Sequence, residues 1–518
     1  MIGIETEYGI YVEGKGAQDL VAEATTLVKH CPGPVVTAWD YRHEHPRRDV
    51  RGFTVDHLSV DPHDAQFEQS GKPHSTDIEV RADRVLPSGA RLYNDHGHPE
   101  YSTPECTSLR ELIAHDRAGE RVMQTCATRR MSRSGPGTVS LYKNNTDFHG
   151  ASYGTHESYL LSRDVPFPDL LAALLPFFAT RPIFAGAGKV GSEPSPVAGV
   201  QYQLSQRADF FSVEASVDTL YNRPLVNTRD EPHADARKYR RFHVICGDAN
   251  FCEVATLLKT GTTLLTLRLL ETGWRPEGVA LANPVEAVKQ ISRDQSLKWI
   301  VDRAGGGTIG AIDVQRHFLS AAKDKLAGLS DEADLVLAEW ESVLERLASD
   351  PLGLSDTLDW AAKRALLDEY RAAENVGWDD PVLQSLDLEY HNVDPDAGLY
   401  LALEQEGRVR RVVGEEDIVH AMTNPPAGSP RAIVRGLAVS KFAEAVQSVT
   451  WSRLTLDDGA GQSVGIRMSQ VQDLDPVRVR EMVGPAETPG AFVQALESLE
   501  REAGADLNDN ADDDNPAA

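Results

Sequence analysis

Alternating polar and apolar side chains in residues 90–105 predict two strands joined by a tight turn. In a strand from Arg91 to Asp95, the side chains of Arg91, Tyr93 and Asp95 share one face, whereas the other face is apolar or small. A glycine and a proline mark the turn, and Glu100 begins a second run that returns a carboxylate beside Asp95. Such a layout suits a hard cation, and an exposed hairpin with ordinary surface charge is the alternative interpretation.

The first residues of the chain repeat this pattern. Glu5 and Glu7 stand two positions apart, so in a strand both carboxylates lie on one face. Two neighbouring acids repel each other, and a fold tolerates them best when a cation lies between them. Solvated glutamates on an edge strand are the alternative.

Further along the chain, hydrophobic periodicity predicts a mixture of helices and strands. A strand beginning near His156 would place His156, Ser158 and Leu160 on one face, and an apolar strand from residue 242 carries His243. Either histidine fits a buried structural role, or could join carboxylates in a mixed nitrogen and oxygen metal site. Helical spacing is found in five segments, at residues 108–126, 254–270, 331–348, 356–373 and 437–446.

Two arginines are candidates for gripping phosphate. Gln203, Ser205 and Arg207 would share a face of another strand, and Arg229 lies in a dense polar turn at residues 227–233. Arginine binds phosphate through a planar fork of donors, although a surface position is the commoner outcome for such residues.

Changes in composition divide the chain into segments. Residues 42–84 are polar without periodicity and predict a lid-like insertion in a catalytic domain that spans residues 1–424. A proline-rich linker begins at Asn424, which predicts a small C-terminal domain over residues 425–505. Residues 506–518 are rich in aspartate and predict a disordered acidic tail.

Overall composition limits the classes of function. The 518 residues carry a net charge of −27, which argues against nucleic acid or an anionic membrane as the main partner. The five cysteines lack C-x-x-C spacing, and the sequence contains no signal peptide or membrane-spanning apolar run, so we expect a soluble, cytoplasmic protein. The G-x-G-x-x-G match at residues 186–191 runs into prolines instead of a helix, and the P-loop motif is absent from the sequence.

Several of these motifs, in order, resemble one enzyme family. Residues 3–9, 90–105, 150–159, 227–233 and 239–250 are similar to those of the Pup deamidases, or depupylases, over a stretch from Ile2 to about Leu456. These enzymes form a family with the Pup ligases and are related to glutamine synthetase and the carboxylate-amine ligases. The resemblance implies an α+β fold, with a curved, mainly antiparallel sheet like that of glutamine synthetase, packed helices and a small C-terminal domain. It also implies ATP and Mg²⁺ as cofactors, and Pup and pupylated proteins as partners.

The resemblance also assigns roles to individual residues. Asp95 would be the catalytic carboxylate. The magnesium ligands would be Glu5, Tyr93, Glu100, His156 and His243, and Glu7 joins this set through its place on the same strand face as Glu5. The nucleotide contacts would be Arg91, Ser102, Thr103, Ser158 and Trp451, with Arg207 and Arg229 as further phosphate candidates. Family members usually carry a few residues before the first glycine, whereas only Met1 and Ile2 precede Gly3 here, a departure that bears on the pairing of the first strand.

Within the family, the sequence favours a deamidase over a ligase. Residues 52–78 resemble an insertion that the deamidases carry and the ligases lack, and residues 95–99 resemble the deamidase form of that turn. We expect hydrolysis of the C-terminal glutamine amide of Pup and of Pup-lysine isopeptide bonds, with Asp95 as nucleophile or as general base. A Pup ligase and a non-catalytic, nucleotide-dependent Pup-binding adaptor are the alternatives. Pup is acidic, so docking requires a local basic groove, for which the run from Arg237 to Arg241 is a candidate.

Overall fold

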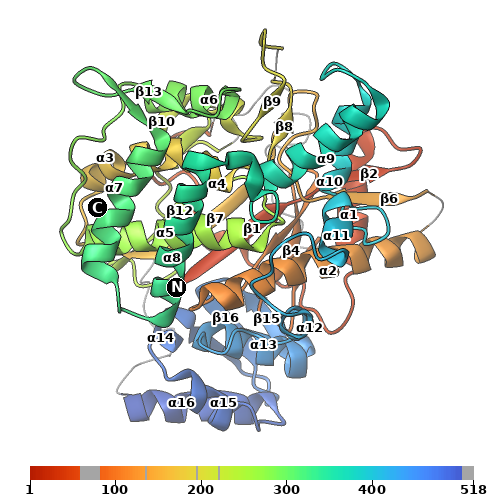
Figure 1. The fold of residues 1–518 in the computed structure, drawn as a ribbon. Helices are drawn as coiled ribbons and strands as arrows, with labels where there is room; N and C mark the ends of the chain where they lie inside the picture. Colours follow the sequence, from red (N-terminus) through yellow and green to blue (C-terminus); the bar gives the residue numbers. More distant parts are fainter. Residues whose placement is uncertain (59–81, 135–136, 194–195, 220–221, 504–518) are drawn as a thin grey trace.

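A six-stranded antiparallel sheet forms the centre of the molecule (Figure 1). The computed structural model describes residues 1–58, 82–134, 137–193, 196–219 and 222–503. The strand order is β12-β7-β1-β5-β4-β3. The strands are β1 (Ile2–Glu7), β3 (Asp83–Val85), β4 (Arg91–Asp95), β5 (His98–Ser102), β7 (Thr155–Ser162) and β12 (Tyr239–Val244). The hairpin predicted from alternation is confirmed as β4 and β5, and β1 pairs with neighbours on both sides from Ile2 onward.

One face of this sheet is covered by helices. Alternate residues of β1 and β7 are buried, and helices α1 (Leu20–Lys29), α2 (Leu109–Arg133) and α5 (Glu253–Glu271) pack against the sheet. The helix predicted at residues 108–126 is α2, and Ser108 caps it by accepting hydrogen bonds from the backbone N–H groups of Arg110 and Glu111. The opposite face of the sheet is left to the polar residues that alternate with the core residues.

The remaining elements surround this unit. Short sheets pair β2 (Gly9–Val12) with β6 (Val139–Tyr142), β8 (Lys189–Val190) with β9 (Tyr202–Gln203), β10 (Val213–Ser216) with β11 (Pro224–Asn227), and β13 (Ile300–Asp302) with β14 (Thr308–Gly310). The helices between α2 and the C-terminal part, besides α5, are α3 (Phe167–Thr180), α4 (Pro182–Ala185), α6 (Pro284–Arg293), α7 (Ala311–Leu326), α8 (Asp331–Ser349), α9 (Asp359–Glu374), α10 (Val382–Tyr390), α11 (Leu399–Gln405) and α12 (Glu415–Ala421). The helices predicted at residues 254–270, 331–348 and 356–373 are confirmed as α5, α8 and α9. Among the described residues, none of the helices is both long enough and apolar enough to cross a membrane.

The C-terminal elements build a second hydrophobic cluster at one end of the molecule (blue in Figure 1). They are α13 (Pro430–Phe442), α14 (Met468–Val471), α15 (Pro476–Val483), α16 (Pro489–Ala503) and a three-stranded sheet of β15 (Val446–Val449), β16 (Arg453–Asp457) and β17 (Ser463–Arg467). Val36, Trp39 and Val85 join this cluster from the N-terminal part of the chain. The guanidinium of Arg435 in α13 also donates to the carbonyl of Gly89, which ties the cluster to the loop before β4.

The structure corrects two local predictions. The helix predicted at residues 437–446 begins earlier, at Pro430, because Ser429 caps it and proline is favoured in the first helical turn. The strand through Gln203, Ser205 and Arg207 ends at Gln203, because the Ser205 hydroxyl accepts from the Arg207 backbone N–H and turns the chain. Most of the predicted insertion at residues 42–84 and the predicted tail at residues 506–518 lie outside the described residues.

Candidate active site

The register of the sheet gathers the predicted site residues on its polar face. Tyr93 lies opposite Glu100, and Glu100 lies opposite Glu7 on β1. Two residues along β1, Glu5 lies between Ser102 of β5 and His156 of β7. Because each step of two residues returns to the same face, side chains from four strands meet although the sequence separates them widely.

Glu5, His156 and His243 form the first cluster, with ligand atoms all within 4.8 Å of one another. Oε2 of Glu5 lies 3.5 Å from Nδ1 of His156 and 3.8 Å from Nε2 of His243. Burial, followed by the charge of Arg241, lowers the pKa of His243 well below its usual value. The imidazole is therefore neutral at physiological pH, the form that binds a metal, and within the described residues neither ring nitrogen has a hydrogen-bond partner.

Glu7, Asp95 and Glu100 form the second cluster, again with oxygen atoms within 4.8 Å. Glu100 is buried, and its Oε1 lacks a hydrogen-bond partner in the part of the chain that the structure describes. Burial, followed by the charges of Asp95 and Glu5, raises the pKa of Glu100 well above its usual value. Three carboxylates and an unpaired buried oxygen match the ligand preferences of a hard divalent cation.

Asp95 is the most accessible acid of the second cluster. It ends β4, and 37% of its side chain is exposed. Burial opposes ionisation, but His96, whose Nδ1 lies 3.0 Å from Oδ1, acts together with His156 and Arg91 to lower the pKa of Asp95. The site thus holds one carboxylate that is ionised and reachable beside another, Glu100, that resists ionisation. This difference in pKa is typical of a site for acid-base or nucleophilic chemistry.

Arg91 and Tyr93 stack beside the second cluster. The Arg91 guanidinium lies 3.8 Å from the centre of the Tyr93 ring and donates to the Asp83 carboxylate at 2.8 Å. Burial, followed by the charges of Glu100 and Asp95, raises the pKa of Tyr93 well above its usual value, so its hydroxyl is protonated.

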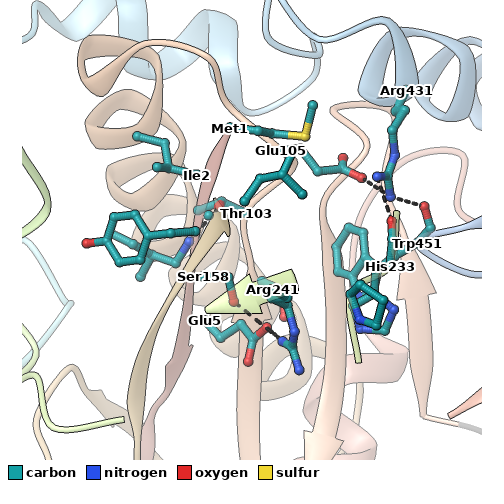
Figure 2. A pocket seen from close by; sticks show the side chains of 16 residues that line it. Met1, Ile2, Glu5, Thr103, Glu105, Ser158, His233, Arg241, Arg431 and Trp451 are labelled. Atoms are coloured by element: carbon teal, nitrogen blue, oxygen red, sulfur yellow. Dashed lines mark hydrogen bonds and ion pairs between the residues drawn. The ribbon is translucent and has the colours of Figure 1, made fainter. Parts of the chain in front are cut away.

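A pocket with largely apolar walls adjoins the first cluster (Figure 2). Four predicted nucleotide contacts line it: Ser102, Thr103, Ser158 and Trp451. Glu5 and Arg241 also line it, with Arg241 Nη1 3.3 Å from the Glu5 carboxylate, and Figure 2 shows this pair beside Ser158. An apolar pocket that ends in charged groups suits a ligand with a flat apolar part and an anionic part.

Three predicted arginines lie outside the lining of this pocket: Arg91, Arg207 and Arg229. Arg207 is 2% exposed, and its Nε and Nη1 have no hydrogen-bond partner among the residues described. Burial, followed by the charge of Arg223, lowers the pKa of Arg207 to about 10. Burial also lowers the pKa of Arg229, and its Nε lies 3.9 Å from Glu231.

The sequence interpretation did not place Arg241 in the candidate site. It treated residues 237–241 as one basic run, but in the structure the arginines of this run lie in different environments. Arg237 is exposed and pairs with Asp235, whereas Arg241 faces Glu5 inside the site. Arg241 and His243 alternate on β12, so the strand period was the signal that could have placed both in the site. Glu105 and Arg431, which also line the pocket, carry no comparable sequence signal because their contact joins distant segments.

Gly154 lies next to one residue of each cluster, so a substitution there tests whether both clusters bind the cation. A Cβ atom at this position would lie 2.3 Å from Nε2 of His156 and 2.7 Å from Oε1 of Glu7. Both atoms are tips of side chains, so the fold can adapt only by displacing these two candidate ligands. We expect Gly154→Ala to weaken cation-dependent activity by roughly 10- to 100-fold with little loss of stability, measured by magnesium titration and thermal unfolding.

Gly119→Ala is the matched control for this variant. Its Cβ would lie 2.5 Å from the buried ring of Tyr101, on the covered side of the sheet. That clash should lower the unfolding temperature and leave the magnesium dependence unchanged. An equal shift of the magnesium titration in both variants would contradict the placement of His156 and Glu7 as cation ligands.

Comparison with known proteins places this site in a family context. The family model described as "Pup-ligase protein" matches residues 1–455. A depupylase of Acidothermus cellulolyticus is 41% identical over 488 residues, covering 92% of this chain and 94% of the relative. A Pup deamidase/depupylase of Mycolicibacterium smegmatis is 40% identical over 512 residues, covering 96% and 97%. A Pup–protein ligase of Nakamurella multipartita is 42% identical over 389 residues, covering 73% and 85%.

Two solved structures are similar over most of the chain. The complex between Pup and its ligase PafA superimposes with a TM-score of 0.75 at 29% identity, covering 98% of this chain and 95% of that one. The Pup ligase PafA in complex with ADP gives a TM-score of 0.68 at 32% identity, covering 81% and 90%.

Proposed function

Since this chain belongs to the family of Pup-ligase proteins, we propose that it is an ATP- and magnesium-dependent hydrolase acting on Pup. It deamidates the C-terminal glutamine of Pup to glutamate and cleaves the isopeptide bonds that join Pup to lysine side chains. One observation carries this proposal: an accessible, ionised Asp95 stands beside Glu7 and Glu100, in a chain that aligns with depupylases over more than nine-tenths of its length.

Coverage in the sequence comparison favours the hydrolase over the ligase. The depupylase and deamidase relatives match 92% and 96% of this chain, whereas the ligase relative matches 73% at a similar identity. Forming an isopeptide bond in water must be coupled to ATP cleavage, whereas hydrolysing an amide runs downhill and uses the nucleotide only as part of the site. The adaptor alternative has no support in the geometry, because the candidate catalytic and ligand residues are present together.

The geometry supports separate sites for the nucleotide and the cation. The pocket lined by Ser158, Thr103 and Trp451 would hold the nucleotide, in keeping with the ADP bound to the PafA neighbour. The two clusters would hold Mg²⁺, which when bound neutralises the acids and polarises phosphate or carbonyl oxygens. The carboxylate cluster suits magnesium better than the mixed histidine cluster, because Mg²⁺ prefers oxygen ligands.

Two broader assignments also belong to this proposal. The central antiparallel sheet, with helices on one face and charged ligands on the other, supports the predicted likeness to glutamine synthetase. All five cysteines are free thiols, which fits the predicted cytoplasmic location.

In the mechanism we favour, Asp95 attacks the side-chain carbonyl of the Pup glutamine or glutamyl-lysine bond. The amide C–N bond breaks as the leaving nitrogen takes a proton from water and departs as ammonia or the lysine amine. The hydroxide left behind then hydrolyses the acyl-enzyme to glutamate and free Asp95. The alternative is that Asp95 removes a proton from the attacking water or from a phosphate-derived nucleophile as a general base. Trapping with hydroxylamine distinguishes the routes, because an acyl-enzyme releases the glutamyl hydroxamate.

Mass spectrometry of glutamine-ended Pup incubated with the protein, ATP and magnesium tests the proposed reaction. We expect conversion of the terminal glutamine to glutamate, and release of free Pup from a Pup conjugate, with far less than one ADP formed per product. An unchanged C-terminus would contradict the deamidase and favour an adaptor. Attachment of Pup to lysine with one ADP per conjugate would favour the ligase.

A further inference from the structure

A continuous stack of side chains connects the C-terminal helix α13 to the central sheet. The guanidinium of Arg435 lies 4.7 Å from the centre of the Trp451 ring, which meets Trp39 edge to face at 5.2 Å. The guanidinium of Arg91 lies 3.9 Å from the centre of the Trp39 ring on one side and 3.8 Å from the centre of the Tyr93 ring on the other. Each distance falls within the range for an attractive contact, either between a cation and an aromatic ring or between two rings packed edge to face.

Trp39 holds the centre of this stack in a fixed orientation. Its side chain is buried at 1% exposure, and the indole N–H donates to the Glu44 carboxylate at 2.9 Å. Its neighbours in the chain bond to the C-terminal sheet: the Val449 backbone N–H donates to the carbonyl of Ala38, and the Asp40 N–H donates to that of Val449. Trp39 thus comes from the N-terminal part of the chain but packs as a member of the C-terminal hydrophobic cluster.

The two ends of the stack serve different parts of the site. Trp451 lines the same pocket as Glu5, which belongs to the first cluster (Figure 2). Tyr93 stands opposite Glu100, which belongs to the second cluster. A shift of the Trp39 ring would therefore disturb both the pocket wall and the group beside the carboxylates.

We propose that Trp39 is a positioning residue that fixes Trp451 for the nucleotide and Arg91 with Tyr93 for the cation, so that the two ligands bind as a unit. This inference rests on the proposed function, because it takes the pocket as the nucleotide site. A Trp39 that merely fills the core would affect stability and leave the affinity for nucleotide unchanged.

Trp39→Leu keeps an apolar residue but removes both ring contacts. We expect the affinity for ADP in the presence of magnesium, measured by titration calorimetry, to fall roughly tenfold. As the affinity falls, the KM for ATP and the magnesium concentration needed for half-maximal binding should both rise. The kcat for glutamine-ended Pup at saturating ligands should change by less than about threefold. Trp39→Phe keeps a smaller ring and should weaken ADP binding by only about three- to fivefold.

Trp340→Leu is the matched control, because Trp340 is also fully buried but lies in α8, within the larger hydrophobic cluster. This variant should lower the unfolding temperature and keep the wild-type affinity for ADP. A folded Trp39→Leu protein with wild-type ADP affinity would overturn the inference, and so would an equal loss of affinity in Trp340→Leu. Should Trp39→Leu fail to fold, an unchanged ADP affinity in Trp39→Phe overturns it as well. Failure of the wild type to deamidate Pup would instead overturn the proposed function, since ADP binding is measured separately.

Discussion

Asp95→Asn should abolish the conversion of glutamine-ended Pup to its glutamate form, with turnover reduced by roughly 10³-fold or more. The substitution keeps the size of the side chain but removes its negative charge, so neither attack on the amide carbonyl nor proton abstraction from water remains available. Asp95 lies 3.0 Å from His96 and is partly exposed, so an amide fits the same space. Mass spectrometry of the Pup product under single-turnover conditions measures the loss.

The affinity for nucleotide separates this chemical role from a structural one. Asp95 does not line the pocket beside Trp451, so ADP binding should stay within about threefold of the wild type. Asp169→Asn is a charge-matched control, because Asp169 is a partly exposed residue of α3 that pairs with Arg275. Near-normal turnover in Asp95→Asn would mean that another group attacks the amide, and equal loss in both variants would point to a general effect of charge.

The strand period predicted the polar face of the sheet because it is a local property. Alternation along β4 places Arg91, Tyr93 and Asp95 together, and the same rule joins Glu5 to Glu7. The register between strands is not local. That Glu5 lies between Ser102 and His156 depends on how three distant segments pair. The family resemblance implied that these residues share a site, but neither it nor the periodicity predicted the register.

Contacts between the N-terminal and C-terminal parts of the chain could not be predicted from the sequence patterns. Trp39 reads as one aromatic residue before a polar segment, and its stacking with Trp451 depends on packing across more than four hundred residues of chain. The contact of Glu105 with Arg431 is equally remote. The start of α13 at Pro430, by contrast, could have been predicted locally, because proline is typical of the first helical turn. We missed it because the prolines were interpreted as part of a linker.

Glu100→Gln should lower turnover by roughly 100-fold or more and, in contrast, stabilise the magnesium-free protein, with an unfolding temperature higher by roughly 1–3 °C. Burial and the charges of Asp95 and Glu5 raise the pKa of Glu100, so the magnesium-free fold binds a proton that the unfolded chain releases. Its contribution to stability is full below the ordinary glutamate pKa of about 4.3 and is lost as the pH rises through the raised pKa. Glutamine is neutral throughout, so that loss should disappear.

Thermal unfolding in EDTA from about pH 5 to pH 8 measures how the unfolding temperature changes with pH. Repeating the series with magnesium measures how much the bound cation stabilises the fold. Magnesium should stabilise the wild type, because it neutralises acids that otherwise repel each other, and should stabilise Glu100→Gln far less because one ligand is weakened. Glu341→Gln, at a partly exposed residue paired with Lys323, is the control and should leave both curves unchanged. An unfolding temperature that falls in Glu100→Gln, with the pH slope intact, would contradict the repulsion among Glu7, Asp95 and Glu100 and remove the physical reason for a cation there.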